Sequence, residues 1–480
     1  MASPAGAASA GRPAGAGRAL PASQGGAGPA VITGLVADST GGHFTDQYGQ
    51  PRLWVATETW GLPVNAGNYS STYQHDYDTF FSVRASQGFT VMMTDPVWAE
   101  SGQATTYNGN TWDGLTPLAG GSTDPSTAAL NPTFWTRIDY MLTSAAAQGI
   151  TVAMTLQNED DTANGSWFGN AWTNTQWQAW ANKLATRYLG TPNLIWLIGN
   201  DAFSPFGDPA WNAILAGLAA AGDSRLISVW YNAETTSRYV TDTNASEDWG
   251  VTNARFNFCY SYNALYWIIE YAYLEVADEG AASLLPVIWG DGYFYTSDPG
   301  PYYDPVDRFM RQAWWWALAS GARGVLGEAE NVYPWPSTAM AAVTGDWFFA
   351  NNAAPVVSLF TGLPGWHQLV PDTSNALVTG GRGTRVSGLA SGGGGGSYSG
   401  FSNSYVAASR TGDGKLAVLY LPNSTTITID QSQLAAGYTA TWVDPVTCAK
   451  TTASTGSTYN STAKGNNSQG DPDWVLVFQG

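Results

Sequence analysis

Acidic side chains stand just after several short apolar runs in this 480-residue sequence. Two are especially informative: Asp201 follows the run Leu194–Ile198, and Asp291 follows the run Leu285–Ile288. Two carboxyl groups at one site can hydrolyse a glycosidic bond, because one protonates the leaving oxygen while the other attacks the anomeric carbon or activates water. The sequence therefore points to glycoside hydrolysis, provided that the fold brings the two aspartates together.

Other polar and aromatic side chains follow the same kind of run, and we predict that they bind substrate. Aromatic rings stack on the C–H faces of sugars, while carboxylate, amide and phenol groups hydrogen-bond to sugar hydroxyls. In chain order, the predicted substrate-binding residues are Glu58, Trp60, Asp95, Trp98, Asn158, Asn200, Tyr260, Tyr262, Trp289, Tyr293, Glu328 and Glu330.

Each aspartate also has a structural alternative. Asp201 could cap the next helix, although Asp208 lies closer to the start of the helical pattern and is the better cap. Asp291 precedes a glycine, and Asp-Gly is a strong turn signal. If Asp291 is only a turn residue, Glu328 and Glu330 are the reserve nucleophiles, and either could instead bind substrate hydroxyls.

The elements that would position these residues alternate along the chain. The predicted strands are Leu53–Thr57, Thr90–Thr94, Thr151–Leu156, Leu194–Ile198, Leu226–Trp230, Phe256–Tyr260, Leu285–Ile288 and Gly324–Gly327. Helical patterns fill every gap except residues 235–255, and they cover Thr72–Gln87, Pro132–Gln148, Thr175–Leu189, Pro209–Ala221, Ala264–Glu279 and Pro305–Ser320.

Eight such repeats predict an α/β fold, specifically a (β/α)₈ TIM barrel. The competing fold is a doubly wound open sheet, which normally carries a Gly-rich phosphate-binding motif after its first strand, and none follows Thr57. In a TIM barrel the active site lies at the carboxyl ends of the strands. The residues just past each strand are therefore the ones expected to line it. In barrel glycosidases that retain configuration, the acid/base follows strand four and the nucleophile follows strand seven; these positions hold Asp201 and Asp291.

Composition shifts divide the chain into four predicted parts. Residues 1–30 are rich in Ala, Gly and Pro and lack an apolar core of 7 to 15 residues, so we predict a disordered leader rather than an intact signal peptide. The barrel is predicted over 31–380, and a Gly/Ser-rich linker or loop over 381–400. Residues 401–480 alternate with a period of two between turn signals and predict a small antiparallel β-sandwich domain.

Charge and residue usage narrow the class of partner. The net charge of −18 argues against nucleic acid, and no stretch approaches the roughly 20 apolar residues of a membrane span. Charged residues make up 12% of the chain and aromatic residues 13%, which is typical of secreted proteins that bind neutral glycans. We therefore predict a carbohydrate substrate and a secreted or extracellular location. Three His and two Cys, without zinc-site spacing, predict no metal and no cofactor. The oligomeric state is not predicted.

Several segments together resemble the apiosidase-like glycoside hydrolase family, whose barrels carry a C-terminal β domain with a collagen-binding label. The segments that carry the resemblance are Leu53–Val55 with Trp60, Gly88–Val91, Asn131–Pro132, Pro192–Asp201, Ala313–Leu318 and, in the C-terminal region, Trp442–Pro445 and Asp473–Leu476.

The resemblance implies a retaining mechanism with Asp201 as the acid/base, and a furanoside substrate such as an arabinan, a galactan or an apiose-containing glycan. Two departures stand out. Where the family usually has Asp-Gly-Glu after strand seven, this chain has Trp289-Gly290-Asp291, so its nucleophile would be one methylene shorter. After strand one, the usual Gly-Asp-Thr-Ala-Trp is Ala-Thr-Glu-Thr-Trp, which moves the carboxylate to Glu58.

Two other functions stay open at this point. The barrel could be a degenerate, non-catalytic glycan-binding protein, an alternative that the aspartate at 291 favours. The C-terminal domain could bind a protein partner, as its label suggests, although its sequence shows no basic or extended aromatic groove. Loss of hydrolysis on replacing Asp201 and Asp291 would separate an enzyme from a binding protein.

Overall fold

A computed structural model describes most of the chain. The described residues are 35–37, 42–98, 109–157, 172–202, 209–231, 256–261, 266, 268–270, 272–273, 285–292, 294–295, 306–329, 332, 335–345, 353–385 and 404–480. The predicted leader and most of the predicted linker lie outside these ranges, as does the fifth connection of the barrel.

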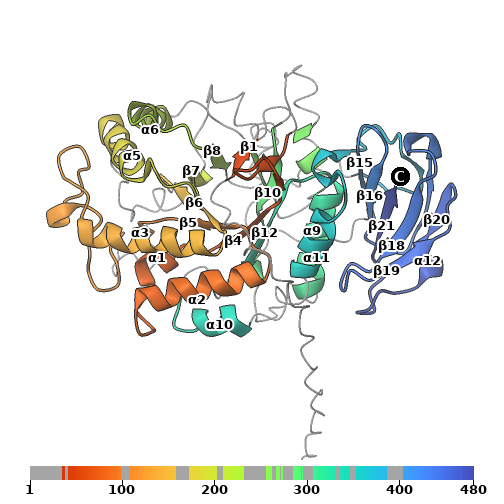
Figure 1. The fold of residues 1–480 in the computed structure, drawn as a ribbon, viewed down its shortest axis with the longest axis horizontal. Helices are drawn as coiled ribbons and strands as arrows, with labels where there is room; N and C mark the ends of the chain where they lie inside the picture. The colour runs from red at the N-terminus through yellow and green to blue at the C-terminus, as the bar shows by residue number, and fades with distance from the viewer. Residues whose placement is uncertain are drawn as a thin grey trace, which may run out of the picture. The chain divides into compact units, whose positions relative to one another are not determined.

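Parallel strands form the predicted TIM barrel (Figure 1). Backbone pairing joins neighbours in the order β8, β7, β6, β5, β4, β12, β10, β9, with the short strand β11 beside β12. Each of the eight predicted runs overlaps one barrel strand. Apolar segments of β-prone residues bounded by turn residues can be recognised from local sequence alone. The strands are β4 (Trp54–Glu58), β5 (Val91–Thr94), β6 (Thr151–Thr155), β7 (Leu194–Ala202), β8 (Ile227–Tyr231), β9 (Asn257–Tyr260), β10 (Val287–Asp291), β11 (Phe294–Tyr295) and β12 (Gly324–Ala329).

The seam of the barrel lies between β8 and β9. In the described part of the chain, the backbone ladder ends at these two strands, which run next to each other. The Ser228 hydroxyl on β8 donates a hydrogen bond of 2.8 Å to the carbonyl of Phe256, the residue before β9. A side chain therefore bridges the seam where the backbone pairing stops.

Helices follow the strands and pack on the outside of the barrel. The predicted helical patterns correspond to α2, α3, α5, α6 and α9, and the described residues of the pattern at 264–279 are helical as well. Gly88, Gly149, Gly222 and Gly321 end four of these patterns with positive φ, a conformation that suits glycine. The helices are α1 (Leu62–Asn65), α2 (Tyr73–Ser86), α3 (Pro132–Ala147), α5 (Asn174–Tyr188), α6 (Pro209–Ala220), α9 (Val306–Ala319), α10 (Ala339–Gly345) and α11 (Ala354–Thr361), with the 3₁₀ turn η1 (Ala119–Gly121).

A small antiparallel sheet precedes the barrel. It consists of β1 (Val36–Ala37), β2 (Phe44–Thr45) and β3 (Pro51–Arg52). The ring of Phe44 lies 5.5 Å from the ring of Trp54 and 5.6 Å from that of Phe256. Trp54 and Phe256 stand at the amino-terminal ends of their strands, so Phe44 fills the end of the barrel opposite the predicted site.

The C-terminal region is a sandwich of two antiparallel sheets with an apolar core between them. Two of its strands, β13 and β14, lie inside the range predicted for the barrel, which places the start of the β region before residue 380. Strands of two or three residues carry no readable period, and their partners come much later in the chain. One sheet contains β13 (Val370–Pro371), β15 (Ala407–Arg410), β16 (Leu416–Leu421), β21 (Trp474–Gln479), β18 (Thr439–Val443) and β19 (Lys450–Ala453); the other contains β14 (Val378–Gly380), β17 (Thr426–Ile429) and β20 (Thr458–Asn460); short helical turns are η3 (Trp366–Gln368), η5 (Gln431–Gln433) and α12 (Ser461–Lys464).

Helix α9 joins the barrel to the C-terminal sandwich, and it runs beside β12, β15 and β16 (Figure 1). Its three consecutive tryptophans are fully buried and point to different neighbours. The indole N–H of Trp314 donates to Leu326 of the barrel, that of Trp315 to the Pro445 carbonyl at 3.0 Å, and that of Trp316 to the Tyr405 carbonyl. The two regions therefore share one continuous apolar core.

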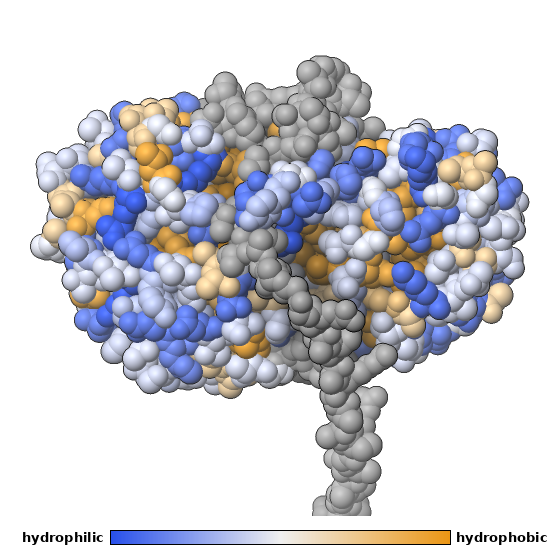
Figure 2. Space-filling view, in the orientation of Figure 1, coloured by the Kyte–Doolittle hydropathy of each residue, from blue (hydrophilic) through white to orange (hydrophobic). Residues whose placement is uncertain are grey.

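The surface carries no simple division of polarity on the face shown in Figure 2, where hydrophobic and hydrophilic residues are interspersed. Among the described residues, most tryptophans are in the interior instead: Trp54, Trp135, Trp180, Trp196, Trp211, Trp230, Trp289, Trp314, Trp315, Trp316 and Trp335 are fully buried, and Trp60, Trp98, Trp177, Trp366, Trp442 and Trp474 are buried as well. The high aromatic content is thus mainly a property of the core.

Candidate active site

Alternate residues of each barrel strand face the interior, and this alternation decides which side chains reach the mouth. On β4, Trp54 and Ala56 pack in the interior cluster, so the same parity assigns Glu58 to the inside. On β5, Val91 and Met93 are the interior residues, which places Asp95 inside just after the strand. Both carboxylates are buried at the carboxyl ends of their strands.

Hydrogen bonds between neighbouring strands fix these two positions. The Thr94 hydroxyl donates to the carbonyl of Thr59 at 2.6 Å, and the Thr59 N–H donates to the carbonyl of Met93. Asp95 Oδ1 accepts from the N–H of Val97 at 2.9 Å, which forms a tight turn after β5. Glu58 and Asp95 therefore lie at the carboxyl ends of adjacent strands, in a hydrogen-bonded part of the barrel mouth.

Asp291 reaches the interior because β10 contains a β-bulge. Trp289 pairs with Cys259, but Asp291 pairs with Tyr260, so two steps along β10 match one step along β9. Without the bulge, Asp291 would share the face of Trp289, which points outward into the layer between strands and helices. The bulge instead aligns Asp291 with Tyr260, whose side chain belongs to the interior cluster.

Gly290 makes this bulge sterically possible. A Cβ at position 290 would lie 2.5 Å from the ring of Phe258, well inside van der Waals contact. The Asp-Gly pair 291–292 that suggested a turn is part of the same irregular strand end.

Two neutral N–H groups donate hydrogen bonds to the carboxylate of Asp291. Trp230 Nε1 on β8 donates to Asp291 Oδ2 at 2.9 Å, and the Gly292 N–H donates to Oδ1 at 2.5 Å. The Asp291 side chain is only 3% exposed. Hydrogen bonds donated to a carboxylate stabilise its ionised form. This environment suits a nucleophile or base better than an acid.

Trp230 also organises the aromatic floor of the mouth. Its ring lies 5.0 Å from the ring of Trp60 and 5.0 Å from that of Phe258. Trp230 is not among the predicted site residues, because the prediction covers only residues at or past the strand ends. The available signal was its position: Trp230 is the penultimate residue of β8 and, by the alternation of side chains, faces the interior.

Strand β7 bulges at its carboxyl end in a similar way. Ile198 pairs with Val229, whereas Ala202 pairs with Tyr231, so β7 holds two extra residues at this point. Gly199 has a φ of 77° within the bulge. Asn200 and Asp201 belong to this segment, and the structure describes their backbone but not their side chains. Ala202, the residue after Asp201, pairs with Tyr231, which directly follows the tryptophan that donates to Asp291.

The predicted site residues fall into four groups. Glu58, Trp60, Asp95, Trp98, Tyr260 and Asp291 gather on the inner side of the barrel, all of them more than nine-tenths buried. Trp289 does not join them, because it points outward and is fully buried beneath the helices. Only the backbone is described for Asn200, Asp201 and Glu328. The predicted residues Asn158, Tyr262, Tyr293 and Glu330 lie outside the described residues.

The described parts of the chain contain no candidate metal-binding cluster and no candidate membrane-spanning helix. Within them, His, Cys, Asp and Glu side chains form no group of three or more that could hold a metal ion. None of the helices described there is long and apolar enough to cross a bilayer.

Comparisons with known proteins show matches to two protein-family models. Residues 39–356 match the family model described as "Apiosidase-like, catalytic domain", and residues 397–479 match a second model named for a collagen-binding domain of a collagenase. A search of curated proteins finds no match.

Solved structures of similar fold cover nearly the whole chain. One described as a glycoside hydrolase has a TM-score of 0.69 at 17% identity, with 93% of this chain and 96% of that chain covered. A glycoside hydrolase family 5 protein from Bacteroides vulgatus has a TM-score of 0.65 at 17% identity, with 93% of each chain covered. At this identity the likeness establishes the fold alone.

Proposed function

This chain belongs to the apiosidase-like family of glycoside hydrolases, and from that membership we propose that it is a retaining enzyme that uses two aspartates. Asp201 is the acid/base and Asp291 the nucleophile. The observation that carries the proposal is the bulge at Gly290, which brings Asp291 into the barrel and against the indole N–H of Trp230. A turn residue would need neither the bulge nor a buried donor from another strand.

The chemistry proceeds in two steps. Asp201 donates its proton to the glycosidic oxygen while an Asp291 oxygen attacks the anomeric carbon, so the bond to the leaving sugar breaks as the glycosyl–Asp291 ester forms. Asp201 then takes a proton from water, and the resulting hydroxide displaces Asp291 from the anomeric carbon. Two displacements at one carbon return the original configuration.

The side chains around Asp291 support the two-step route. Trp230 and Gly292 donate to the carboxylate in its ionised state and fix its orientation, so that one oxygen can be presented to the sugar. In this proposal, Glu58 at the end of β4 and Asp95 just after the adjacent strand β5 accept hydrogen bonds from sugar hydroxyls. Trp60 and Tyr260 supply rings beside them.

The substrate we propose is a cell-wall poly- or oligosaccharide, and within that class a furanoside such as an arabinan, a galactan or an apiose-containing glycan. The family supports the furanoside, and the sparse charge of the chain supports a neutral sugar at the reacting centre. We place its action outside the cell, where such glycans are found.

The test is hydrolysis by the full chain and by Asp201→Asn and Asp291→Asn variants on a panel of plant and bacterial cell-wall glycans. We expect each variant to lose at least about 10³-fold in kcat while it retains the thermal midpoint of the parent. NMR of the first product should show the same anomer as the substrate. Azide should restore turnover to Asp291→Ala and give a glycosyl azide of inverted configuration.

Several results would overturn the assignment. An inverted product would assign Asp291 to water activation rather than attack. Full activity in Asp291→Asn would move the nucleophile to Glu328 or Glu330. If the parent binds glycans but hydrolyses none of the panel, the barrel acts as a binding protein.

A further inference from the structure

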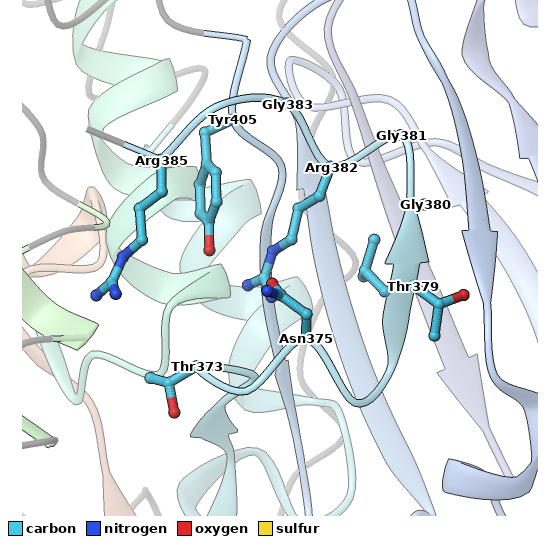
Figure 3. A pocket seen from close by; sticks show the side chains of 10 residues that line it. Thr373, Asn375, Thr379, Gly380, Gly381, Arg382, Gly383, Arg385 and Tyr405 are labelled. Atoms are coloured by element: carbon cyan, nitrogen blue, oxygen red, sulfur yellow. The ribbon is translucent and has the colours of Figure 1, made fainter. Parts of the chain in front are cut away.

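A polar cavity lies at the edge of the C-terminal sandwich, on the segment that links β14 to β15 (Figure 3). Its volume is about 490 Å³, within the range of small-ligand sites. The side chains that matter are those of Thr373, Asn375, Thr379, Arg382, Arg385 and Tyr405. None of them belongs to the barrel mouth.

Arg382 forms the inner wall of the cavity and is committed to structure. It is buried, and it donates to the Val406 carbonyl, to Asp372 and Asn375, and to Glu270 on the barrel side. Its guanidinium also lies over the ring of Tyr405, 4.8 Å from the centroid. These contacts hold the cavity in shape, so Arg382 has little left to offer a ligand.

Arg385 is different. Its Nε lies 3.1 Å from Glu270 Oε2, and its side chain is 33% exposed. Arg187 is exposed to a similar extent, but it donates hydrogen bonds to both carboxylate oxygens of Asp139 through Nε and Nη2. For Arg385, the contacts found among the described residues leave the end of the guanidinium, Nη1 and Nη2, without a carboxylate.

Glu270, the carboxylate that lies against Arg385, also interacts with other groups. Glu270 is fully buried and receives Arg382 and the Tyr405 hydroxyl as well as Arg385. Arg385 thus keeps positive charge at the rim of the cavity while its stem is fixed by Glu270. A guanidinium whose Nε only lies against one carboxylate, and whose other N–H groups form no hydrogen bond with the described residues, can bind a second carboxylate with two parallel hydrogen bonds.

The rest of the lining is suited to hydroxyl groups. Thr373 brings a hydroxyl, whereas the Thr379 hydroxyl donates to the Thr428 carbonyl and points away from the arginines in Figure 3. Asn375 brings an amide whose oxygen accepts from Arg382 at 2.6 Å, which directs its NH₂ donors elsewhere. Figure 3 shows Tyr405 between the two arginines, with Asn375 and Thr373 near their ends. One cation together with several neutral hydroxyl and amide groups matches an acidic sugar: one carboxylate on a ring of hydroxyls.

We propose that this cavity is a second, non-catalytic glycan site that binds a uronic acid residue, with its carboxylate on Arg385. The site goes beyond the proposed hydrolysis, because it uses no residue of the barrel mouth. It would let the enzyme hold an acidic portion of a cell-wall glycan while the barrel acts on a neutral one.

The experiment is calorimetric titration of the full-length Asp291→Asn variant, whose cavity is unchanged, with trigalacturonate and with its carboxyl-reduced neutral counterpart. Salt is held at 0.15 M, where the Debye length is about 8 Å, so that the net negative charge of the protein is screened. We expect saturable binding of trigalacturonate and at least tenfold weaker binding of the neutral trisaccharide. Arg385→Gln should weaken trigalacturonate binding at least tenfold, while Arg187→Gln should leave it unchanged.

Two further measurements keep the proposal falsifiable. Thr373→Val, which touches no ion pair, should weaken binding several-fold even if Arg385→Gln lowers the thermal midpoint. Acetate and inorganic phosphate, tested alone, should bind at least tenfold more weakly than trigalacturonate. The proposal is overturned if Arg385→Gln binds normally, if the neutral trisaccharide binds as well, or if free phosphate binds equally. Failure of hydrolysis by the parent enzyme would leave this test untouched.

Discussion

Buried carboxylates serve opposite purposes at the barrel mouth and at the junction with the C-terminal sandwich. At the mouth, Asp291 accepts hydrogen bonds from the neutral N–H groups of Trp230 and Gly292. At the junction, Asp473 meets the guanidinium of Arg311, and Glu270 meets Arg382 and Arg385. Neutral donors orient a carboxylate without cancelling its charge, whereas arginine pairs cancel it. The first arrangement is suited to chemistry and the second to holding two regions together.

The pKa values at the junction reflect this difference. Burial raises the pKa of Glu270, and Arg382 and Arg385 partly offset that increase. Burial likewise raises the pKa of Asp473, against the opposing effect of Arg311. The ion pairs therefore recover only part of the cost of burying these charges. The pair of Arg311 with Asp473 links α9 to the sandwich, and the pairs of Glu270 link the barrel to the segment before β15.

The largest effect on stability is expected from Arg311→Met. It leaves Asp473 buried without its cation and should lower the free energy of unfolding by about 3–5 kcal/mol. Adding Asp473→Asn should recover most of that loss, because Tyr420 and Asn467 still hydrogen-bond position 473. Urea unfolding measures both.

Two controls define this prediction. Arg187→Met removes a half-exposed pair with Asp139 and should cost no more than about 1 kcal/mol. Asp291→Asn should change the unfolding midpoint little although it abolishes turnover. If Arg311→Met unfolds like the parent, the junction is not held by this pair.

Gly290→Ala tests whether the bulge is needed to bring Asp291 inside. The new methyl group would meet the ring of Phe258, and overpacking of this kind costs about 1–3 kcal/mol. Activity should fall much further than stability, since the strand can relieve the clash by losing the bulge and turning Asp291 outward. Gly190→Ala is the matched control, because a Cβ there meets nothing within 4 Å. Equal activity in both variants would refute the role of the bulge.

Trp230→Phe keeps a ring beside Trp60 but removes the N–H donor to Asp291. We expect kcat/KM to fall about tenfold, as for one hydrogen bond to a charged group. The acidic limb of the pH–rate profile should move to higher pH, because the ionised carboxylate has lost a stabilising donor. Trp180→Phe, which removes the N–H donor to the Leu156 carbonyl, should leave the profile in place. A uniform drop without a pH shift would assign Trp230 to packing alone.

The smallest effect is the pH dependence of Glu270. Its pKa is raised in the folded protein, so the folded state takes up the proton first as pH falls from 7 toward 4.5. Parent stability should therefore rise relative to Glu270→Gln over this range, by about 1.4 kcal/mol for each unit of difference between the folded and unfolded pKa values.

Asp413 provides a control of opposite sign. Hydrogen bonds from Thr411 and Lys415 lower its pKa to about 2, so its stabilising effect is fully present above its ordinary pKa and is lost only as pH falls through about 2. The stability difference between the parent and Asp413→Asn should stay constant from pH 7 to 4.5. Thermal midpoints across this range decide both expectations.

Local sequence was sufficient for the parts of the fold that are encoded locally. Strand runs such as Thr151–Thr155 and helices such as α3 carry their own periodicity, and a β/α alternation leaves few other topologies. The positions past each strand could be named for the same reason, which is how Glu58, Asp95 and Asp291 were selected. The short strands β13 and β14 could not be predicted, because two or three residues have no period.

Tertiary structure alone decided which way the side chains point and which groups they contact. The bulge at Gly290 exists only relative to β9, and Trp230 meets Asp291 across 61 positions of sequence. Trp289 looked equivalent to Trp60 in sequence, yet one points outward and the other inward. The pairing of Glu270 with Arg382 and Arg385 likewise joins residues that are more than a hundred positions apart. Such contacts depend on how separate elements pack, and no local pattern records that packing.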